Sequence, residues 1–448
     1  MVMIRNLSCS LSRSAIAKTL LSPSNSRPSS HSAIPLLAPL AGQRLRNNSA
    51  AFEPEFRDTT TTRCLHSLGS GGGLPSSMRA AVFREPNKPL TFEEFHIPRP
   101  KSGELLIKTK GGLPIGSRVV GAFIMPCGNC SYCSKGHDDL CEDFFAYNRA
   151  KGTLYDGETR LFLRSSGKPV YMYSMGGLAE YCIVPANALT ILPESLPYIE
   201  SAVLGCAVFT AYGTMANAAQ VKPGDSVAVI GIGGVGSSCL QIARAFGASD
   251  IIAVDVQDEK LQKAKIFGAT HAVNAAKEDA VAKIMIIVVL LRCEIMPVCT
   301  WLVSSYTTPQ RNISSFEDYI EWPHLRIIEI TGGKGVDIAV EALGRPQTFL
   351  QCVQSVKDGG KAVMVGLSQA GAVGEVDINR LVRRKIQIIG SYGGRARQDL
   401  PKLVRLAESG IFDLANAVSR RYKFEESNEA FQELNKGSIV GRAVVEIM

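Results

Sequence analysis

Four cysteines stand close together in the chain and could hold a metal ion. Cys127, Cys130, Cys133 and Cys141 form a C-x2-C-x2-C-x7-C motif. Thiolates at this spacing can close a tetrahedral zinc site, and four sulfur ligands leave no open position for a substrate water. The motif therefore predicts a structural zinc site rather than a catalytic one.

An iron–sulfur cluster, disulfides and free thiols are the alternatives for these cysteines. The bacterial ferredoxin run has three residues before its last cysteine and then proline. Here seven residues precede Cys141, and Glu142 follows it. Twelve cysteines in 448 residues do not make a disulfide scaffold, and in a reducing compartment clustered thiols indicate metal. Because four cysteines fill the coordination shell, we expect His137, inside this loop, to lie at the surface.

A glycine-rich turn further along the chain predicts a dinucleotide site. The segment Gly231-Ile232-Gly233-Gly234-Val235-Gly236 directly follows the apolar run 226–230 and precedes a helical pattern over 240–246. The next apolar run, 251–254, ends in Asp255, about twenty residues after the turn, as the dinucleotide fingerprint requires. A glycine-rich turn with a solvent-exposed carboxylate is the alternative interpretation.

Each glycine of this turn has a physical role in the predicted site. Gly231 permits the tight turn, Gly233 lets the backbone approach a pyrophosphate, and Gly236 lets the helix pack on the strand. Gly234 and Val235 belong to the same turn and are assigned to the cofactor site with them. The N-terminus of the following helix would face the phosphates.

Asp255 and the later strands complete the predicted nucleotide-binding half. Asp255 would accept hydrogen bonds from the adenosine ribose hydroxyls and repel a 2′-phosphate, so NAD is favoured over NADP. Further apolar runs at 271–273, 337–341 and 361–366 continue the strand pattern. We therefore predict a doubly wound α/β sheet, with Val365 in its last run assigned to the cofactor site.

Composition narrows the class of protein. Of the formal net charge of +8, residues 1–77 supply +5, because they hold eight Lys and Arg against three Asp and Glu. The remainder gives no reason to expect nucleic acid as a partner. The longest apolar run, 284–291, has eight residues and is too short for a membrane span, so we expect no membrane.

The first fifty residues contain eleven Ser, spaced Arg and Lys, and no Asp or Glu, which is typical of an organellar transit peptide. Ile4, Leu7, Leu11 and Ala15 would share one helix face, and this favours a mitochondrial over a plastid destination. An untargeted, disordered tail of a cytoplasmic protein is the alternative. We interpret residues 1–77 as transit peptide and linker, with folded sequence from Met78.

A four-cysteine lobe that precedes a dinucleotide-binding half is the layout of the zinc-containing medium-chain alcohol dehydrogenases, which this sequence resembles over 78–110, 116–284 and 329–448. The stretches 176–181 and 204–213 also look like that family. The resemblance, which is to the plant organellar type, implies a GroES-like catalytic domain at 78–208. It further implies a Rossmann domain at 209–390 and a return to the first domain at 391–448.

The resemblance also implies activity and site residues. The family transfers hydride between an alcohol or aldehyde and NAD(H), uses zinc, and forms homodimers or homotetramers. Cys206 matches a ligand of the catalytic zinc, Thr210 a residue against the nicotinamide, Lys260 the adenosine-ribose lysine, and Arg442 an arginine near the pyrophosphate. Alternatively, Cys206 is a small buried hydrophobe, and Lys260 and Arg442 are solvated ends of elements.

The sequence departs from the family after Lys110. Relatives carry there a longer segment with the first cysteine ligand of the catalytic zinc, the proton-relay hydroxyl, and a Gly-His-Glu with the histidine ligand. None of the six histidines of this chain follows Gly and precedes Glu. Because an open zinc site needs three protein ligands, Cys206 alone cannot hold a catalytic zinc, and we expect no alcohol dehydrogenase activity.

A second departure is a block of foreign sequence at about 285–328. It holds both tryptophans of the chain, Trp301 and Trp322, and has no metal-ligand spacing. One missing and one added block indicate altered splicing. The sequence thus predicts an NAD-dependent, zinc-containing alcohol dehydrogenase-type oxidoreductase with an incomplete catalytic site. The alternatives are an inactive NAD-binding partner subunit or mis-spliced isoform and, less favoured because of its four-cysteine lobe, a zinc-free quinone reductase.

Overall fold

The computed structural model describes residues 2–3, 74–108, 118–277 and 334–447. Most of the predicted transit peptide, the segment after Lys110 and the predicted foreign block lie outside the described residues. Among the helices that the structure describes, none combines the length and the apolar composition that a membrane crossing requires.

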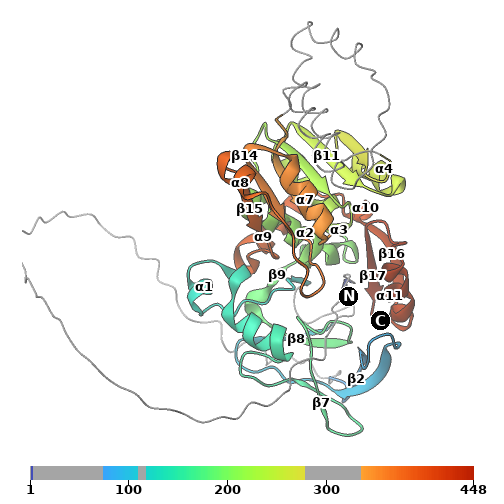
Figure 1. Cartoon of the computed structure of the whole chain (residues 1–448). Coiled ribbons are helices and arrows are strands. Elements are labelled where there is room, and N and C mark those ends of the chain that lie inside the picture. Colours follow the sequence, from blue (N-terminus) through green and yellow to red (C-terminus); the bar gives the residue numbers. More distant parts are fainter. Residues whose placement is uncertain (1, 4–73, 109–117, 278–333, 448) are drawn as a thin grey trace, which may run out of the picture. The chain divides into compact units, whose positions relative to one another are not determined.

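Among the described residues, the nucleotide-binding half is built on one parallel sheet of six strands (Figure 1). In the order β12-β11-β10-β13-β14-β15, they are His271–Asn274, Asp250–Asp255, Ser226–Ile230, Val336–Glu341, Val356–Met364 and Gln387–Gly390. Every residue of β10 is buried, as expected for a central parallel strand. The predicted α/β fold is confirmed. The predicted strand 361–366 begins earlier and ends at Met364, so Val365 lies just beyond it.

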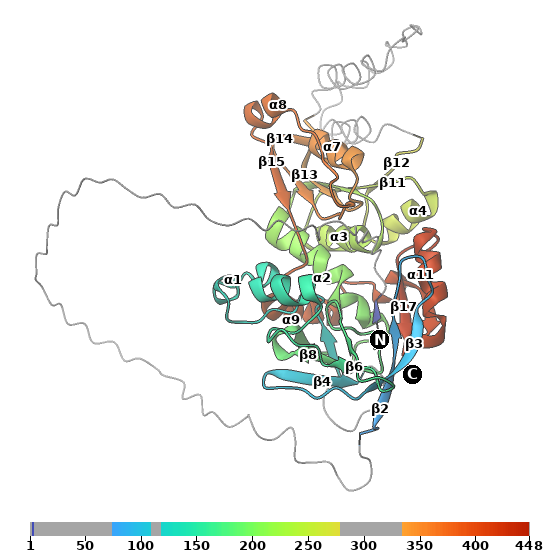
Figure 2. The ribbon, with the colours of Figure 1, turned by 60° about the horizontal axis from the view of Figure 1, so that its bottom comes forward.

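The two faces of this sheet pack against different helices. Val227 and Val229 share a core with Leu240 of α3 (Gly234–Ala245), whereas Ala228 and Ile230 share one with Val353 of α7 (Pro346–Ser355). This alternation follows from the two-residue period of a strand. Figure 2 shows α3 and α7 beside the strands. The continuous apolar run of β10 is explained because both faces are covered.

Helix α3 begins earlier than its apolar pattern predicts. It starts at Gly234, with Gly233 as its N-cap residue, whereas the predicted pattern starts at Leu240. The first turn carries glycines and small polar side chains, so it has no apolar period for sequence reasoning to detect. The helix that follows β11, α4 (Asp258–Ile266), has acidic residues in its first turn and lysines in its last, which complements the helix dipole.

In the catalytic half, the described strands form antiparallel pairs. They are β2 (Ser77–Val82) with β3 (Thr91–His96), β4 (Glu104–Lys108) with β8 (Tyr181–Pro185), β5 (Val119–Gly121) with β9 (Leu189–Ile191), and β6 (Leu161–Phe162) with β7 (Pro169–Val170). The connection between β4 and β5 contains the position after Lys110 at which the sequence departs from the family. Within the part of the chain that the structure describes, these pairs do not join into one large sheet.

The C-terminal strands β16 (Val418–Lys423) and β17 (Arg442–Glu446) are parallel, and α11 (Ser427–Asn435) connects them. The other edge of β17 pairs with β1 (Val2–Met3), with Val2 opposite Val445 and Met3 opposite Val444. This differs from our expectation that folded sequence begins at Met78. An edge of β17 with unpaired backbone groups can accept even a very short apolar strand.

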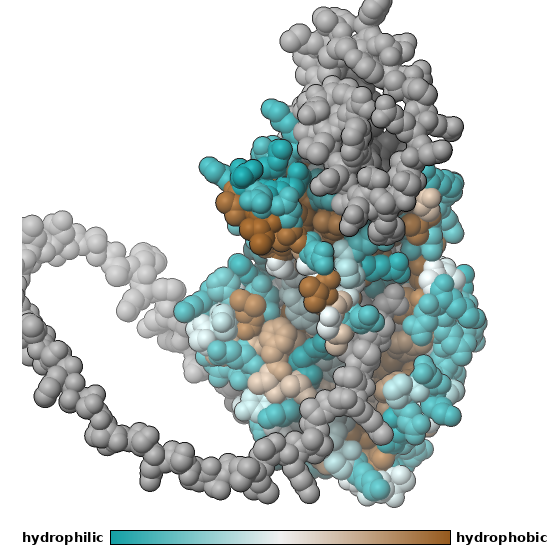
Figure 3. Space-filling model, in the orientation of Figure 1, coloured by the Kyte–Doolittle hydropathy of each residue, from teal (hydrophilic) through white to brown (hydrophobic). Residues whose placement is uncertain are grey.

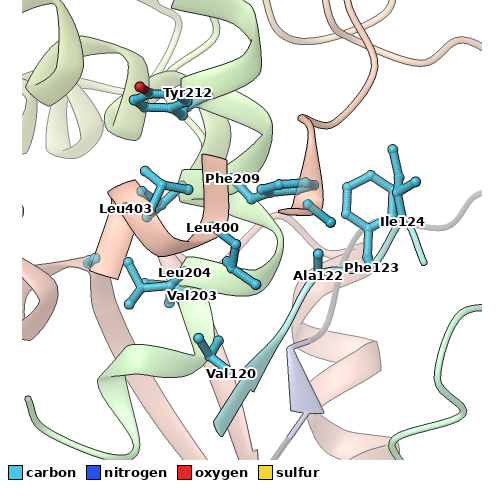
Figure 4. Close-up of a cluster of buried hydrophobic side chains, with 14 of the residues drawn as sticks. Val120, Ala122, Phe123, Ile124, Val203, Leu204, Phe209, Tyr212, Leu400 and Leu403 are labelled. Carbon is cyan, nitrogen blue, oxygen red and sulfur yellow. The ribbon is translucent and has the colours of Figure 1, made fainter. Parts of the chain in front are cut away.

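A cluster of buried hydrophobic side chains fixes the position of α2 (Ala207–Tyr212). Phe209 of α2 packs with Leu400 of α9 (Ala396–Glu408) and with Phe123, which follows β5 (Figure 4). A Cβ at Gly205 would lie 2.1 Å from the carbonyl oxygen of Gly121, so only glycine allows β5 to pass this closely. This crossing fixes where Cys206 and Thr210 lie.

Candidate metal and dinucleotide sites

The structure brings the sulfurs of all four motif cysteines together. Cys127, Cys130, Cys133 and Cys141 have their Sγ atoms within 4.8 Å of one another, and Sγ of Cys127 lies 4.0 Å from Sγ of Cys133. A tetrahedral zinc with bonds of about 2.3 Å separates its sulfurs by about 3.8 Å. The cluster therefore fits a zinc ion with small adjustments.

Backbone N–H groups of the loop are directed at these sulfurs. Asn129 and Cys130 donate to Sγ of Cys127 at 3.4 and 3.3 Å, and Cys127 and Phe144 donate to Sγ of Cys141 at 3.3 and 3.4 Å. Such donors favour the thiolate over the thiol. The loop thus presents thiolate-stabilising groups as well as sulfurs.

The thiol pKa values differ among the cysteines of the lobe. Burial raises the pKa of Cys127 well above its usual value and raises that of Cys133 to about 12. For Cys130, burial raises the pKa, but the N–H groups of Cys133 and Glu142 outweigh it and lower the pKa to about 7. Zinc binding must therefore displace protons from the buried thiols.

The glycine turn has the geometry that pyrophosphate binding needs. Gly231 has φ of +95°, and a Cβ at Gly236 would lie 1.9 Å from the carbonyl oxygen of Gly231. A Cβ at Gly233 would meet nothing within 4 Å, so the turn is open on that side. No side chain caps the N-terminus of α3, which leaves its first N–H groups available to an anion. The turn fits a dinucleotide.

Arg442 lies directly against this turn. A Cβ at Gly234 would be 1.7 Å from Nε of Arg442, although the two residues are far apart in the sequence. Arg442 is 8% exposed, so it is not the solvated strand end of the alternative interpretation. Val235, next in the turn, is half-buried. The predicted pyrophosphate arginine and the glycine turn are therefore neighbours.

Asp255 ends β11 and is tied to the turn. Its Oδ2 accepts a hydrogen bond from the N–H of Ile232 at 2.8 Å, and its Oδ1 accepts from Val256 and Gln257 at 2.8 and 3.1 Å. Nζ of Lys260 lies 3.9 Å from Oδ2, and the two side chains are 16% and 5% exposed. The alternatives of a solvated carboxylate and a solvated lysine do not hold.

Glu341, at the carboxyl end of β13, is a site residue that the sequence reasoning missed. Its Oε1 accepts hydrogen bonds from the N–H groups of Leu343 and Gly344 at 2.9 and 2.7 Å. The Leu343 side chain lies next to Gly231, where an added Cβ would approach it to 2.6 Å. The available signal was an acidic residue that ends a buried strand, the same pattern that identified Asp255.

Cys206 is the N-cap residue of α2, on which Thr210 lies, and neither belongs to a metal site among the described residues. The N–H of Thr210 donates to the carbonyl of Cys206 at 2.8 Å, and Cys206 is half-buried. Oγ1 of Thr210 is buried and has no hydrogen-bond partner among the described residues. Within the described ranges, no group of three or more possible metal ligands includes Cys206. These residues therefore do not fit a catalytic zinc.

Comparison with known families accounts for this arrangement. The family model "Alcohol dehydrogenase GroES-like domain" matches residues 103–194, and the model "Zinc-binding dehydrogenase" matches residues 234–288 and 316–409. Together they match more than half of the chain. The chain belongs to the zinc-dependent medium-chain alcohol dehydrogenase superfamily. The second match leaves 289–315 uncovered, inside the block that we predict to be foreign.

Curated members of the superfamily align with nearly their full length. The chain is 26% identical to S-(hydroxymethyl)glutathione dehydrogenase of Saccharomyces cerevisiae over 408 residues, covering 82% of this chain and 95% of the yeast protein. It is also 26% identical to the protein of the same name from Escherichia coli over 405 residues, covering 81% and 98%. Over most of its length, the chain is therefore similar to zinc-binding dehydrogenases of the alcohol dehydrogenase family.

Solved structures of the superfamily share the fold. An alcohol dehydrogenase zinc-binding domain protein from Burkholderia ambifaria matches with a TM-score of 0.68 and 26% identity, covering 83% of this chain and 99% of that protein. Benzyl alcohol dehydrogenase from Acinetobacter calcoaceticus matches with a TM-score of 0.67 and 25% identity, covering 83% and 99%. The predicted combination of a GroES-like and a Rossmann domain is confirmed.

Proposed function

We propose that this chain binds NAD(H) and one structural zinc ion, and that it lacks the catalytic zinc of the alcohol dehydrogenases. The observation that carries the proposal is the buried Asp255, which is bonded to the glycine turn on which Arg442 also lies. The second observation is that Cys206 has no companion ligands among the described residues. A complete cofactor half is thus combined with an incomplete metal site.

The residues of the turn would bind the cofactor through charge and backbone contacts. The free N–H groups at the start of α3, together with Arg442, would hold the pyrophosphate, and the Asp255 carboxylate would accept the adenosine ribose hydroxyls. Bound NAD supplies a hydride acceptor. The unpartnered Oγ1 of Thr210 would donate to the nicotinamide end. A catalytic zinc has no part in the proposed chemistry, because the described residues do not fit one.

The substrate class of the family can be inferred from the names of the chain's relatives. Names of its relatives, such as S-(hydroxymethyl)glutathione dehydrogenase and benzyl alcohol dehydrogenase, indicate an alcohol or aldehyde. Without a Lewis acid to lower the pKa of the alcohol oxygen, we expect this chain to bind NADH without oxidising alcohols. The second candidate is an inactive chain, which is either the NAD-binding partner subunit of an active relative or a mis-spliced isoform. The lack of companion ligands for Cys206 among the described residues supports either form.

The test combines calorimetric titration of NADH and NADPH, zinc analysis, and a turnover assay with short-chain and benzylic alcohols. We expect NADH to bind more tightly than NADPH, one zinc per chain, and no turnover. Asp255→Ser should reduce the preference for NADH by more than about tenfold, because the repulsion of a 2′-phosphate is lost. An unchanged preference would remove Asp255 from the site, and turnover with two zinc ions per chain would refute the incomplete metal site.

We also propose that the chain is imported into mitochondria. The support is the acid-free, serine-rich composition of residues 1–50 and the apolar face at Ile4, Leu7 and Leu11. A fusion of residues 1–77 to a fluorescent protein should accumulate in mitochondria. Accumulation in plastids or the cytosol would contradict this assignment and support the corresponding alternative.

A second copy of the chain is the proposed partner of the nucleotide-binding half. In the described sheet, β15 is the last strand, and Leu367, Val373, Ile378 and Val382 are exposed apolar residues. Figure 3 shows apolar surface where Figure 1 labels α8 (Ile378–Arg383) and β15. We expect a dimer or tetramer by light scattering, and a monomer for the double variant Ile378→Asp, Val382→Asp. A wild-type chain that is monomeric at all concentrations would contradict the proposal.

A further inference from the structure

A buried carboxylate in the zinc lobe is held by a residue from the distant C-terminal segment. Asp138, fully buried between Cys133 and Cys141 in the sequence, accepts hydrogen bonds from Nη2 and Nε of Arg397 at 2.6 and 3.0 Å. The backbone N–H of Arg397 also donates to Asp138, at 3.0 Å. Because an unpaired buried charge is costly, Asp138 depends on Arg397 for its place in the fold.

The same arginine contacts the backbone of a zinc-ligand residue. Nη2 of Arg397 donates to the carbonyl oxygen of Cys133, and Nε2 of the neighbouring Gln398 donates to the carbonyl of Gly136 at 3.0 Å. Cys133 thus has its sulfur in the metal cluster and its carbonyl on Arg397. The first turn of α9 is therefore bonded to the loop that a zinc ion would crosslink.

The linker before α9, residues 391–395, leads from β15 to α9 and packs against α2, the helix that carries Thr210. A Cβ at Gly213 would lie 1.9 Å from the carbonyl oxygen of Gly393, and one at Gly394 would lie 3.1 Å from the Phe209 ring. Figure 4 shows Phe209 next to Leu400 of α9. The linker is thus packed so closely on α2 that the two cannot move independently.

Hydrogen bonds continue this contact to the predicted nicotinamide end. The hydroxyls of Ser391 and Thr214 are 3.1 Å apart, and Oγ1 of Thr214 donates to the carbonyl of Thr210 at 2.9 Å. The N–H of Ser391 also donates to the carbonyl of Met364, the residue before Val365. Contacts therefore run without a break from the zinc lobe through α9 and the linker to the cofactor side of α2.

We propose that Arg397 is a positioning residue that couples zinc binding in the lobe to NADH binding, an inference that rests on the proposed function. With zinc bound, the crosslinked loop holds Asp138 and the Cys133 carbonyl in place for Arg397, which fixes the start of α9 and the linker. Without zinc, this support is lost and the linker loosens against α2. Because coupling between two sites is reciprocal, NADH must in turn stabilise the bound zinc.

The experiment measures zinc release to a coloured chelator, from the full zinc-loaded chain, with and without saturating NADH. We expect NADH to slow release at least about fivefold, the lower end of typical site-to-site coupling. In Arg397→Gln the effect of NADH should fall below about twofold, while NADH still binds. Arg397→Lys keeps the charge but loses the two-pronged geometry, so it should restore only part of the coupling. Arg405→Gln, at an exposed position on the same helix, is the matched control and should behave as the wild type.

Hydrogen exchange of residues 391–398, before and after zinc removal, gives a second measurement that needs no cofactor. Exchange should rise on zinc removal in the wild type, and it should already be raised in zinc-loaded Arg397→Gln. The proposal is overturned if NADH binds but does not alter zinc release, or if Arg397→Gln keeps the full coupling. If NADH does not bind at all, the proposed function fails instead, and unchanged exchange at 391–398 would then refute the role of Arg397 separately.

Discussion

The two halves of this molecule respond differently to an altered chain. In the nucleotide-binding half, the connection from β12 to β13 carries the predicted foreign block, yet β13 stays in register with β10, from Val227 opposite Ile338 to Ile230 opposite Glu341. In the catalytic half, the predicted missing segment lies between β4 and β5, and the described strands form only separate pairs. Adding chain and removing it are therefore not equivalent.

The physical reason lies in what each change removes. In the described sheet, β12 is the last strand on its side, and an edge position is where added chain disturbs the fewest strand pairs. Loop entropy grows slowly, by about 0.6 kcal/mol for each doubling of loop length. A missing segment instead takes its contacts and its chemical groups with it, and Cys206 is left without partner ligands in the described part of the chain. This difference agrees with the proposal that the cofactor half binds NADH while the catalytic half lacks its zinc.

The largest expected effect comes from repairing the catalytic half. Replacing residues 111–116 with the longer segment that the family resemblance implies there, which carries a Cys and a Gly-His-Glu, should supply the missing ligands. The zinc content should then rise from one to two per chain, and alcohol turnover should appear. A gain of at least about 10³-fold over background corresponds to about 4 kcal/mol of transition-state stabilisation. Zinc analysis and NADH absorbance measure both effects. A repaired chain that binds two zinc ions but stays inactive would show that the defect lies elsewhere.

Removing the structural zinc should have the next largest effect. Cys133→Ser should abolish zinc binding and lower the free energy of unfolding by about 4 kcal/mol at zinc concentrations about 1,000 times the Kd. Thermal unfolding with and without added zinc measures this loss. The matched control is Cys239→Ser, a buried cysteine outside the cluster, which should keep its zinc. A stable Cys133→Ser variant that retains zinc would contradict the four-cysteine site.

Two glycines of the cofactor turn separate stability from binding. Gly236→Ala places a Cβ against the carbonyl of Gly231 and should cost about 1–3 kcal/mol of folding free energy. Gly233→Ala has open space and should change stability by less than about 0.5 kcal/mol, yet its methyl group would stand where a pyrophosphate approaches. We expect both to weaken NADH binding by calorimetry. Unaltered NADH affinity in Gly233→Ala would place the pyrophosphate elsewhere.

The smallest effect should follow from deleting the added block. Joining the chain from residue 284 to residue 329 should change NADH affinity by less than about twofold, because none of the described strands of the sheet includes residues of the block. Calorimetric titration measures the affinity, and thermal unfolding should show equal or greater stability. A large loss of NADH affinity would mean that the block contributes to the cofactor half.

Local patterns in the sequence predicted most of the cofactor half. The parallel strands, the glycine turn and Asp255 at the end of β11 each depend on neighbours within a few residues, so period and spacing identify them. The family resemblance supplied Lys260 and Arg442, and the structure places both next to elements already predicted. The roles of Gly231, Gly233 and Gly236 were assigned from the known geometry of the dinucleotide-binding turn.

Contacts between distant parts of the chain could not be predicted in this way. The bond from Asp255 to the N–H of Ile232, the approach of Arg442 to Gly234 and the pairing of Arg397 with Asp138 depend on tertiary packing, which leaves no periodic signal. The pairing of Val2 and Met3 with β17 is of the same kind. The start of helix α3 was also missed, because its glycine-rich first turn has no apolar repeat.

The short pairing of β1 with β17 implies a difference between the precursor and the processed protein. If a protease removes the predicted targeting segment on import, Val444 and Val445 keep β16 as a partner but lose β1 on the other edge. The mature chain then exposes an unpaired sheet edge that its precursor does not. Precursor and mature form would then differ in aggregation rather than in cofactor affinity. An affinity tag at either end of the chain would accordingly stand close to this sheet edge in the sequence, and an internal position is the better choice.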